Sequence, residues 1–484
     1  MQATLAVPAA AEFAPLVPEL VLVGAAFALL MLDLFLPEKH RVLTHLLGVA
    51  ALVLVAVLVG TGVGGSDANV LHGMFLRDGM ADVLKVGVCL VSAVALLYIW
   101  PFLRERSLYK GEVTVLVLFA VVGMMLLISA GSLVMVYLGL ELLALCSYAL
   151  VAVDRDSPLA SEAAMKYFVL GSLASGMLLY GMSLVYGATG SIELATIGAN
   201  AMGNAQPLLL LTGVAFMVAG IAFKFGAAPF HMWLPDVYHG APTPITLFIG
   251  SAPKLAAFAM AIRLLELGAG ALGDYWQPML AVIAALSLLL GNLIALVQTN
   301  LKRMLAYSTV SHVGFLFLGL AGGGSGGYAA SMFYALSYAL MAVAAFGAIV
   351  VLSRRGFEAD RIDDFKGLNA RDPWTAGLVL CVMASLAGVP PFLGFWAKLA
   401  VLRAAIEGGM LWLAIVGIVC AVIGAFYYLR VIKVMYFDEP QGGQAVIPRD
   451  DRVLRVAFGV NALGLLVLGV FWNPLMAWCV QAFA

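Results

Sequence analysis

Long apolar segments recur along the whole chain, separated by short connections rich in glycine, proline and charge. Each segment has about 20 residues, which is the length that an α-helix needs to cross a hydrocarbon layer of about 30 Å. The pattern predicts fourteen membrane-spanning helices, over residues 16–36, 42–62, 80–100, 113–129, 132–153, 162–186, 208–235, 244–267, 277–297, 301–320, 328–353, 373–406, 410–436 and 452–472.

Two of the predicted spans, 208–235 and 373–406, are too long to be single straight helices. The first contains Gly226 and Pro229, and the second contains Pro390 and Pro391. Proline lacks a backbone N–H and interrupts the hydrogen bonding of a helix. We therefore expect the seventh and twelfth spans to be broken helices, which transporters use to build ion sites near the middle of the membrane.

The two predicted broken helices lie five spans apart, so they cross the membrane in opposite directions. Their local sequences are also weakly alike, because Trp233 follows Pro229-Phe230 and Trp396 follows Pro391-Phe392. We therefore predict two inverted five-helix repeats. The expected units are residues 1–112 (helices 1 to 3), residues 113–267 (helices 4 to 8), residues 277–436 (helices 9 to 13) and residues 452–484 (helix 14 and a tail).

Composition agrees with an all-α polytopic membrane protein whose surroundings are a lipid bilayer. Of the 484 residues, 63% are hydrophobic and only 11% are charged, which is more apolar surface than a soluble core of this size could bury. The formal net charge is −1, so there is no basic field that would attract nucleic acid. The five cysteines (Cys89, Cys146, Cys381, Cys420 and Cys479) lie in apolar segments without the spacing of a zinc or iron–sulfur site.

Lysine and arginine are concentrated on one side of the predicted bundle. They gather in the odd-numbered connections, as Lys39, Arg41, Arg104, Arg106, Lys110, Arg155, Lys302, Arg303, Arg354, Arg355, Arg361, Lys366, Arg371, Lys433, Arg449 and Arg452. The even-numbered connections contain almost no basic residue beyond Arg77. Because cytoplasmic connections hold the excess of positive charge, we expect both chain ends to face outward, which requires an even number of spans.

Four ionisable residues fall well inside predicted spans: Glu141, Lys224, Lys254 and Lys398. Each one costs about 2.5–3.5 kcal/mol at the centre of a membrane helix if it is unpaired. Structural ion pairs or side chains that reach toward the interface would explain a single such residue. Four of them favour a functional role, and mid-membrane ionisable residues are typical of proton or ion pathways.

Two of these lysines lie beside a proline. In a continuous helix Pro229 would leave the carbonyl of Phe225 without a donor, next to Lys224, and Pro253 would do the same for Ile249 near Lys254. A free carbonyl in the membrane needs water or a cation. Burial disfavours a charged lysine whereas a nearby carboxylate favours it, so moving Glu141 relative to a lysine would switch its proton affinity. The sequence therefore predicts a proton carrier.

Other ionisable residues leave two interpretations open. Lys166 lies four residues after Glu162, which fits either a surface ion pair or a functional lysine. His312 lies in mid-span, either as a hydrogen-bonded core residue or as a titrating relay. We expect Asp82 and Lys85, three residues apart, to pair with each other, and Glu19 to lie near a helix end within reach of water.

A glycine pattern that resembles a dinucleotide-binding motif has the wrong context. Gly268, Gly270 and Gly273 spell G-x-G-x-x-G, but they lie in a predicted connection between two membrane helices. A dinucleotide site requires a preceding β-strand. We therefore expect no NADH site in this chain.

Four segments resemble the proton-translocating, antiporter-like subunits of respiratory complex I, a family that includes multi-subunit cation/proton antiporters. They are FKFGAAPFHMWLPDVYHGAPTP with Lys224, SAPKLAAF with Lys254, NLKRMLAYSTVSHVGF with His312 and AGVPPFLGFWAK with Lys398. Within the family the segments YLGLELLALCSYALVA and SEAAMKYFVLGSLASGMLLYG are most similar to the branch called subunit N. The resemblance covers nearly the whole chain.

The resemblance implies a role for each matching residue. Glu141 and Lys224 would form the coupled pair of one half-channel, with Lys166 as a further lysine. Lys254 would be the central lysine, His312 a bridge and Lys398 the residue that exchanges protons with the outside.

The resemblance also implies a non-redox subunit of a proton-pumping NADH:quinone oxidoreductase in a bacterial inner membrane, with both termini on the periplasmic side. NADH, FMN, iron–sulfur clusters and quinone would act in other subunits. Its expected partners are the antiporter-like subunit M and small subunits such as K and J. The alternative is a subunit of a sodium or potassium/proton antiporter or of a membrane-bound hydrogenase.

Overall fold

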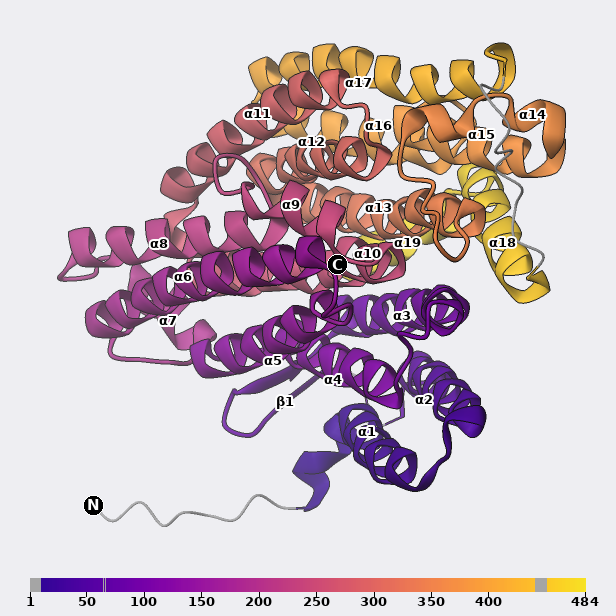
Figure 1. Cartoon of the computed structure of the whole chain (residues 1–484). Helices are drawn as coiled ribbons and strands as arrows, with labels where there is room; N and C mark the ends of the chain where they lie inside the picture. Colours follow the sequence, from indigo (N-terminus) through magenta and orange to yellow (C-terminus); the bar gives the residue numbers. More distant parts are fainter. Residues whose placement is uncertain (1–9, 64, 66, 440–450) are drawn as a thin grey trace.

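The predicted spans form helices that begin and end within a few residues of their expected bounds. The computed structural model describes residues 10–63, 65, 67–439 and 451–484, so Arg449 and the first nine residues of the predicted 1–112 unit lie outside the described residues. Its long helices run side by side, as Figure 1 shows from the indigo N-terminal helices to the orange and yellow C-terminal ones.

The helices up to the middle of the chain are α1 (Val17–Phe35), α2 (Val42–Gly60), α3 (Gly79–Glu105), α4 (Gly111–Ile128), α5 (Leu133–Val151), α6 (Pro158–Thr189), α7 (Leu194–Ala201), α8 (Pro207–Phe225), α9 (Trp233–Gly240) and α10 (Thr243–Ala261), which continues as a π-helical turn over Ile262–Leu267. The remaining helices are α11 (Gly273–Val297), α12 (Leu301–Gly322), α13 (Gly324–Leu352), α14 (Leu368–Arg371), α15 (Pro373–Ala387), α16 (Leu393–Glu407), α17 (Leu411–Phe437), α18 (Arg452–Val470) and α19 (Asn473–Gln481).

Thirteen helices of the described residues are long and apolar enough to cross a membrane. The predicted twelfth span is absent from this set because it is divided into α15 and α16, which have 15 residues each. The predicted seventh span is likewise divided into α8 and α9. The all-α polytopic fold and the two broken helices are thus confirmed.

Several helix starts are fixed by a polar side chain that accepts a hydrogen bond from the first turn. Asp78, Ser132, Ser157, Asn300 and Asp451 cap α3, α5, α6, α12 and α18 in this way. Such caps satisfy backbone N–H groups that have no partner inside the helix. They place the helix starts next to the polar connections that the sequence pattern identified.

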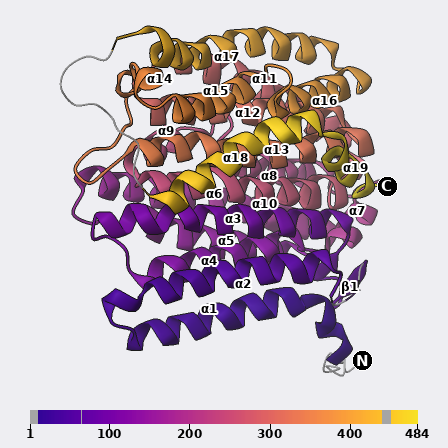
Figure 2. The ribbon, with the colours of Figure 1, turned by 90° about the vertical axis from the view of Figure 1, so that its right-hand side faces the viewer.

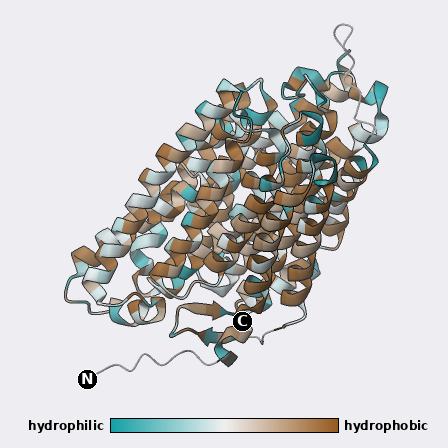
Figure 3. Ribbon diagram, turned by 60° about the horizontal axis from the view of Figure 1, so that its bottom comes forward, coloured by the Kyte–Doolittle hydropathy of each residue, from teal (hydrophilic) through white to brown (hydrophobic). Residues whose placement is uncertain are grey.

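Three helices form the centre of the bundle. Every residue of α10 is buried, and α12 and α13 are buried almost throughout. The outer helices expose much of their apolar surface, and α18 packs against α3, α13 and α15, as it crosses the bundle in Figure 2. In Figure 3 hydrophobic residues cover the helices, whereas hydrophilic residues gather mainly at their ends. An apolar outer surface of this kind suits a lipid surrounding.

The two broken helices have the same local design. Helix α8 ends at Phe225 and is followed by Gly226 with a φ of 74°, and α15 ends at Ala387 and is followed by Gly388 with a φ of 85°. This left-handed conformation favours glycine. Both breaks then contain a cis X–Pro bond, at Pro229 in one and Pro391 in the other. The chain thus leaves two helix C-termini inside the bundle.

The structure also contains short elements that were not predicted, because they are too short to cross a membrane. An antiparallel hairpin joins β1 (Ala68–Val70) and β2 (Phe75–Arg77), and α7 and α19 have only eight and nine residues. These elements lie in connections or at the chain end. The bundle itself follows the predicted order.

Candidate functional site

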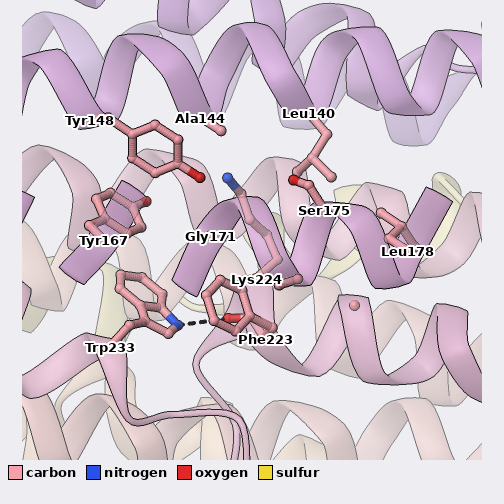
Figure 4. A pocket seen from close by; sticks show the side chains of 12 residues that line it. Leu140, Ala144, Tyr148, Tyr167, Gly171, Ser175, Leu178, Phe223, Lys224 and Trp233 are labelled. Atoms are coloured by element: carbon pink, nitrogen blue, oxygen red, sulfur yellow. Dashed lines mark hydrogen bonds between the residues drawn. The ribbon is translucent and has the colours of Figure 1, made fainter. Parts of the chain in front are cut away.

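Lys224 lies in the last turn of α8 and faces a small cavity. The cavity has a volume of about 20 Å³, enough for about one water molecule, and is lined by α5, α6, α8 and α9. Figure 4 shows the side chain extended toward Tyr148 and Ser175. Within the described residues Lys224 makes no hydrogen bond or ion pair. Its ammonium group therefore depends on water in this cavity for solvation.

Lys254 lies in mid-α10 and is 2% exposed. Its Nζ donates a hydrogen bond of 2.7 Å to the carbonyl of Phe225, the last residue of α8. The sequence correctly predicted a free carbonyl at this position but associated it with Lys224. The carbonyl instead bonds to the lysine of the neighbouring helix, and the two ammonium groups are close enough to repel each other.

Lys398 makes the corresponding contact at the second break. Its Nζ donates to the carbonyls of Leu386 and Ala387 at the end of α15, both at 2.9 Å. A Cβ at the neighbouring Gly388 would lie 2.9 Å from the lysine chain, so glycine provides room as well as the left-handed turn. The ammonium group also lies 5.3 Å from the centre of the Phe315 ring.

Both half-helices therefore end against a lysine. The carbonyls at a helix C-terminus are unpaired within the helix and carry the negative end of its dipole, about half an elementary charge. Hydrogen bonds that involve a charged group contribute about 1.5–3 kcal/mol each. That gain offsets much of the roughly 2.5–3.5 kcal/mol that a charged lysine costs in a membrane helix. Broken helices thus make buried lysines tolerable.

His312 is the centre of a tyrosine network between α12, α13 and α17. Its Nδ1 lies 2.7 Å from the Tyr334 hydroxyl and its Nε2 lies 3.0 Å from the Tyr428 hydroxyl. Tyr428 also forms a hydrogen bond with Ser308. The histidine is 3% exposed, and both tyrosines are 1% exposed. Since each partner can donate or accept a hydrogen bond, this arrangement can relay a proton.

Further hydrogen bonds lie beside this network, toward α11, and they involve Tyr427, Asn292 and Tyr338, which were not predicted from the sequence. Tyr427 donates to Asn292, and Asn292 donates in turn to the hydroxyl of Ser311 at 2.8 Å. Tyr338 packs against the His312 ring and donates to Thr309. These residues lie on helices that are apolar on every side, so helical periodicity does not mark them. An asparagine within an apolar span was the available signal.

Glu141 lies on a face of α5 that the rest of the chain leaves partly uncovered. Leu138 and Leu145, on the same face, are 55% and 56% exposed. One carboxylate oxygen of Glu141 is buried and has no hydrogen-bond partner within the described residues. Its charge attracts that of Lys224, but the two side chains form no ion pair in the described part of the chain. Glu141 is thus half-buried on the uncovered face of α5 and has no ion-pair partner among the described residues.

Lys166 belongs to a surface network. Its side chain is 42% exposed and pairs with Glu162 at 2.7 Å and with Asp236 of α9 at 2.8 Å. Asp236 also binds Arg303 at 3.0 Å. The i,i+4 pair considered from the sequence therefore exists, and it extends to α9, the second half of the first broken helix.

Two expectations about the N-terminal helices are wrong. Lys85 pairs with Glu19 at 2.6 Å rather than with Asp82, and Asp82 pairs with Arg77 of the hairpin at 2.8 Å. Glu19 is 2% exposed, so it is buried by α3 instead of lying within reach of water. The hairpin, which was not predicted, supplies the partner that frees Lys85 for Glu19.

Known proteins resemble this chain over nearly its whole length. The model of the family described as NADH:quinone oxidoreductase/Mrp antiporter, transmembrane, matches residues 130–424. NADH-quinone oxidoreductase subunit N from Xanthomonas euvesicatoria is 67% identical over 481 residues, which cover 99% of this chain and 98% of that protein.

Two solved structures share the fold. A chain of respiratory complex I from Thermus thermophilus, with bound aureothin, has a TM-score of 0.81 and 30% identity, covering 95% of this chain and 98% of that one. A chain of the Mrp complex from a Dietzia species also has a TM-score of 0.81, but its identity is 22%, with coverages of 98% and 96%. The second match concerns the fold alone.

Proposed function

Because this chain belongs to the NADH-quinone oxidoreductase subunit N family and is a proton-translocating membrane subunit of complex I, we propose that its protons move along the buried ionisable residues described above. The path begins at Glu141 and Lys224, continues through Lys254 and His312, and ends at Lys398. The observation that carries this proposal is the contact of two buried lysines with the free carbonyls of two broken helices.

Each residue has a distinct task in this path. Lys224 holds a proton beside a cavity that admits about one water molecule. Lys254 and Lys398 hold theirs against carbonyl oxygens, and His312 exchanges a proton between two tyrosine hydroxyls. Repulsion between the ammonium groups of Lys224 and Lys254 disfavours charging both at once. A proton that arrives at one lysine therefore promotes release from the next.

We propose that Lys166 supplies protons to the entrance of this path. It pairs with Asp236, which lies in the half-helix α9 that follows the first break. A partly exposed lysine at that position can exchange protons with water and remain next to the Lys224 helix. This role is secondary to that of the buried row.

The exposed face of α5 suits a contact with another subunit. A carboxylate that faces lipid alone would cost several kcal/mol, whereas a polar partner would compensate it. We propose that small subunits such as K and J cover this face at Glu141, and that the antiporter-like subunit M is the other neighbour. The cofactors of the complex, NADH, FMN, iron–sulfur clusters and quinone, would then remain in other subunits.

We further propose the inner membrane of a bacterium as the location, with both termini on the periplasmic side. The alternation of Lys and Arg between connections supports this orientation. The matched designs of the two breaks support a division into residues 1–112, the inverted repeats 113–267 and 277–436, and the end unit 452–484.

Proton pumping by the assembled complex tests the path. Replacing Lys224, Lys254 or Lys398 with alanine should slow proton transfer through this subunit by roughly a hundredfold, the effect of removing a positioned proton-transfer group. Lys224→Arg should be equally impaired, because arginine keeps the charge but does not release its proton. The measurement is the number of protons pumped per NADH oxidised in vesicles that contain the complex.

Lys433→Ala provides the matched control, since this lysine is 67% exposed and lies outside the row. It should leave the stoichiometry unchanged. Unaltered pumping in Lys224→Ala and Lys398→Ala would reject the proposed path. It would indicate that the buried charges are vestigial and that this subunit is a scaffold. Sodium/proton exchange by the isolated chain in liposomes, without redox partners, would instead favour an antiporter.

A further inference from the structure

A second cavity lies where the α1–α2 connection meets the end of α3. It has a volume of about 300 Å³, which is large enough for part of a small organic ligand. Three cations line it: Lys39 and Arg41 from the connection and Arg104 from α3. The acidic residue in the lining is Glu38, whose side chain is 91% exposed and lies 3.8 Å from that of Arg41. The cavity is therefore positively charged.

The cations of this cavity lack close partners within the described residues. Arg41 is 3.9 Å from Asp33 and 3.8 Å from Glu38, whereas charge-assisted hydrogen bonds are about 2.7–2.9 Å long. Its Nε is buried and has no hydrogen-bond partner there. Lys39 and Arg104 have no ion-pair partner in the described part of the chain. Their donors remain available to an anion.

An aromatic wall gives the cavity a fixed shape. The rings of Trp100 and Tyr109 pack edge to face with centroids 4.4 Å apart, and His45 stacks on Trp100 at 5.3 Å. The Tyr109 hydroxyl is held by Thr114 at 2.7 Å. Arg104 lies 5.5 Å from the Trp100 ring. Arg104 is thus presented beside a packed aromatic surface, whereas Lys39 and Arg41 come from the α1–α2 connection.

Exposed apolar side chains lie next to these charges in the chain. Leu34 and Phe35, at the end of α1, are 72% and 84% exposed, and Leu46, near the start of α2, is 55% exposed. A soluble anion would leave this apolar surface uncovered. A ligand with a negative head and long apolar chains would satisfy both parts of the surface.

We propose that the cavity binds the phosphate headgroup of an anionic glycerophospholipid whose acyl chains lie along α1 and α2. Guanidinium groups match phosphate oxygens in a two-point contact, and a lysine adds a compact charge. Basic pockets between membrane helices are suited to such headgroups. The lipid would tie the two connections of the N-terminal helices together at the membrane surface.

Photo-crosslinking in the assembled complex tests this assignment. Ser107 lines the cavity and is exposed, so p-benzoylphenylalanine placed there can reach a bound headgroup. In vesicles with equal amounts of phosphatidylglycerol and phosphatidylcholine, mass spectrometry should find mainly phosphatidylglycerol adducts. Lys39→Gln and Arg104→Gln should each lower that yield about fivefold, as expected for one cation at a lipid surface. Lys433→Gln should leave it unchanged.

Several results would overturn the proposal. Equal labelling of both lipids, or yields that do not depend on Lys39 and Arg104, would show that the cavity does not select anionic lipid. Loss of the adduct in millimolar inorganic phosphate would identify a site for free anions. An adduct with a peptide of another subunit would show that protein covers the cavity. Neither glutamine variant breaks a described ion pair, so misfolding does not explain a lower yield.

Discussion

The ion pair of Glu19 and Lys85 allows a quantitative test of which buried charges serve only the fold. The two charged atoms are 2.6 Å apart, and the side chains are 3% and 1% exposed. At an effective dielectric constant of about 20 their attraction is about 6 kcal/mol, and desolvation opposes it by several kcal/mol per ion. The intact pair therefore adds little net stability, but either charge alone would be strongly unfavourable.

Lys85→Met should accordingly lower the free energy of unfolding by about 3–5 kcal/mol, because the Glu19 charge remains buried. Glu19→Met should be somewhat milder, since the Lys85 ammonium lies 4.8 Å from the Phe75 ring and keeps that attraction. The double variant Glu19→Met/Lys85→Met should lose less than about 1 kcal/mol relative to the native chain. Thermal unfolding of the complex in detergent and the amount of this subunit in membranes measure these changes.

Arg403 and Glu407 provide the control, because they form an ion pair of 2.7 Å at side-chain exposures of 78% and 61%. The same substitutions there should cost less than about 0.5 kcal/mol. A double variant at Glu19 and Lys85 that is as unstable as Lys85→Met would refute the argument. A double variant that folds but pumps no protons would show that this pair belongs to the transport path.

Three further predictions concern the site and its surroundings. Tyr428→Phe removes the hydroxyl between Ser308 and His312 and should reduce proton pumping several-fold at a stability cost of about 1 kcal/mol. Tyr427→Phe removes the hydroxyl that donates to Asn292 and should have the smaller effect on protons per NADH. Gly171→Ala places a Cβ 2.0 Å from the Tyr148 hydroxyl and should slow pumping by filling the Lys224 cavity. Gly176 lies on the same helix, and a Cβ there would have no atom within 4 Å, so Gly176→Ala should leave pumping unchanged. Burial alone would raise the pKa of Asp78, but the bonded guanidinium of Arg263 lowers it below its usual value. The ionised Asp78 carboxylate therefore stabilises the fold above about pH 4, and this stabilisation is lost as the pH falls through the lowered pKa. In Asp78→Asn the unfolding temperature should accordingly fall less steeply as the pH is lowered.

The helices and their breaks could be predicted because each depends on nearby residues. A membrane helix requires about 20 apolar residues, and a break requires a proline or a left-handed glycine. Gly226 and Pro229 lie within one short segment, so the local sequence is sufficient. The same reasoning identified Lys224, Lys254 and Lys398 as ionisable residues inside membrane spans, since the free-energy cost of burying them depends only on the span in which they lie.

The partners of those charges could not be predicted, because they come from distant parts of the chain. Lys85 is 66 residues from Glu19, and Lys254 is 29 residues from the carbonyl that it contacts. The sequence spacing predicted an ion pair between Asp82 and Lys85, but the hairpin places Arg77 next to Asp82, and these two residues form the ion pair instead. The tyrosines around His312 were missed for a related reason, since a helix that is apolar on every side has no polar face to mark its special positions.

The carbonyl groups that receive Lys254 and Lys398 are dipoles rather than ions. A lysine paired with a carboxylate leaves a stranded negative charge in the membrane when it loses its proton, and that charge pulls the proton back. A lysine held by a carbonyl leaves only a neutral amine beside a neutral amide. In the proposed path, these two lysines can therefore release and rebind a proton without a compensating movement of any other ion.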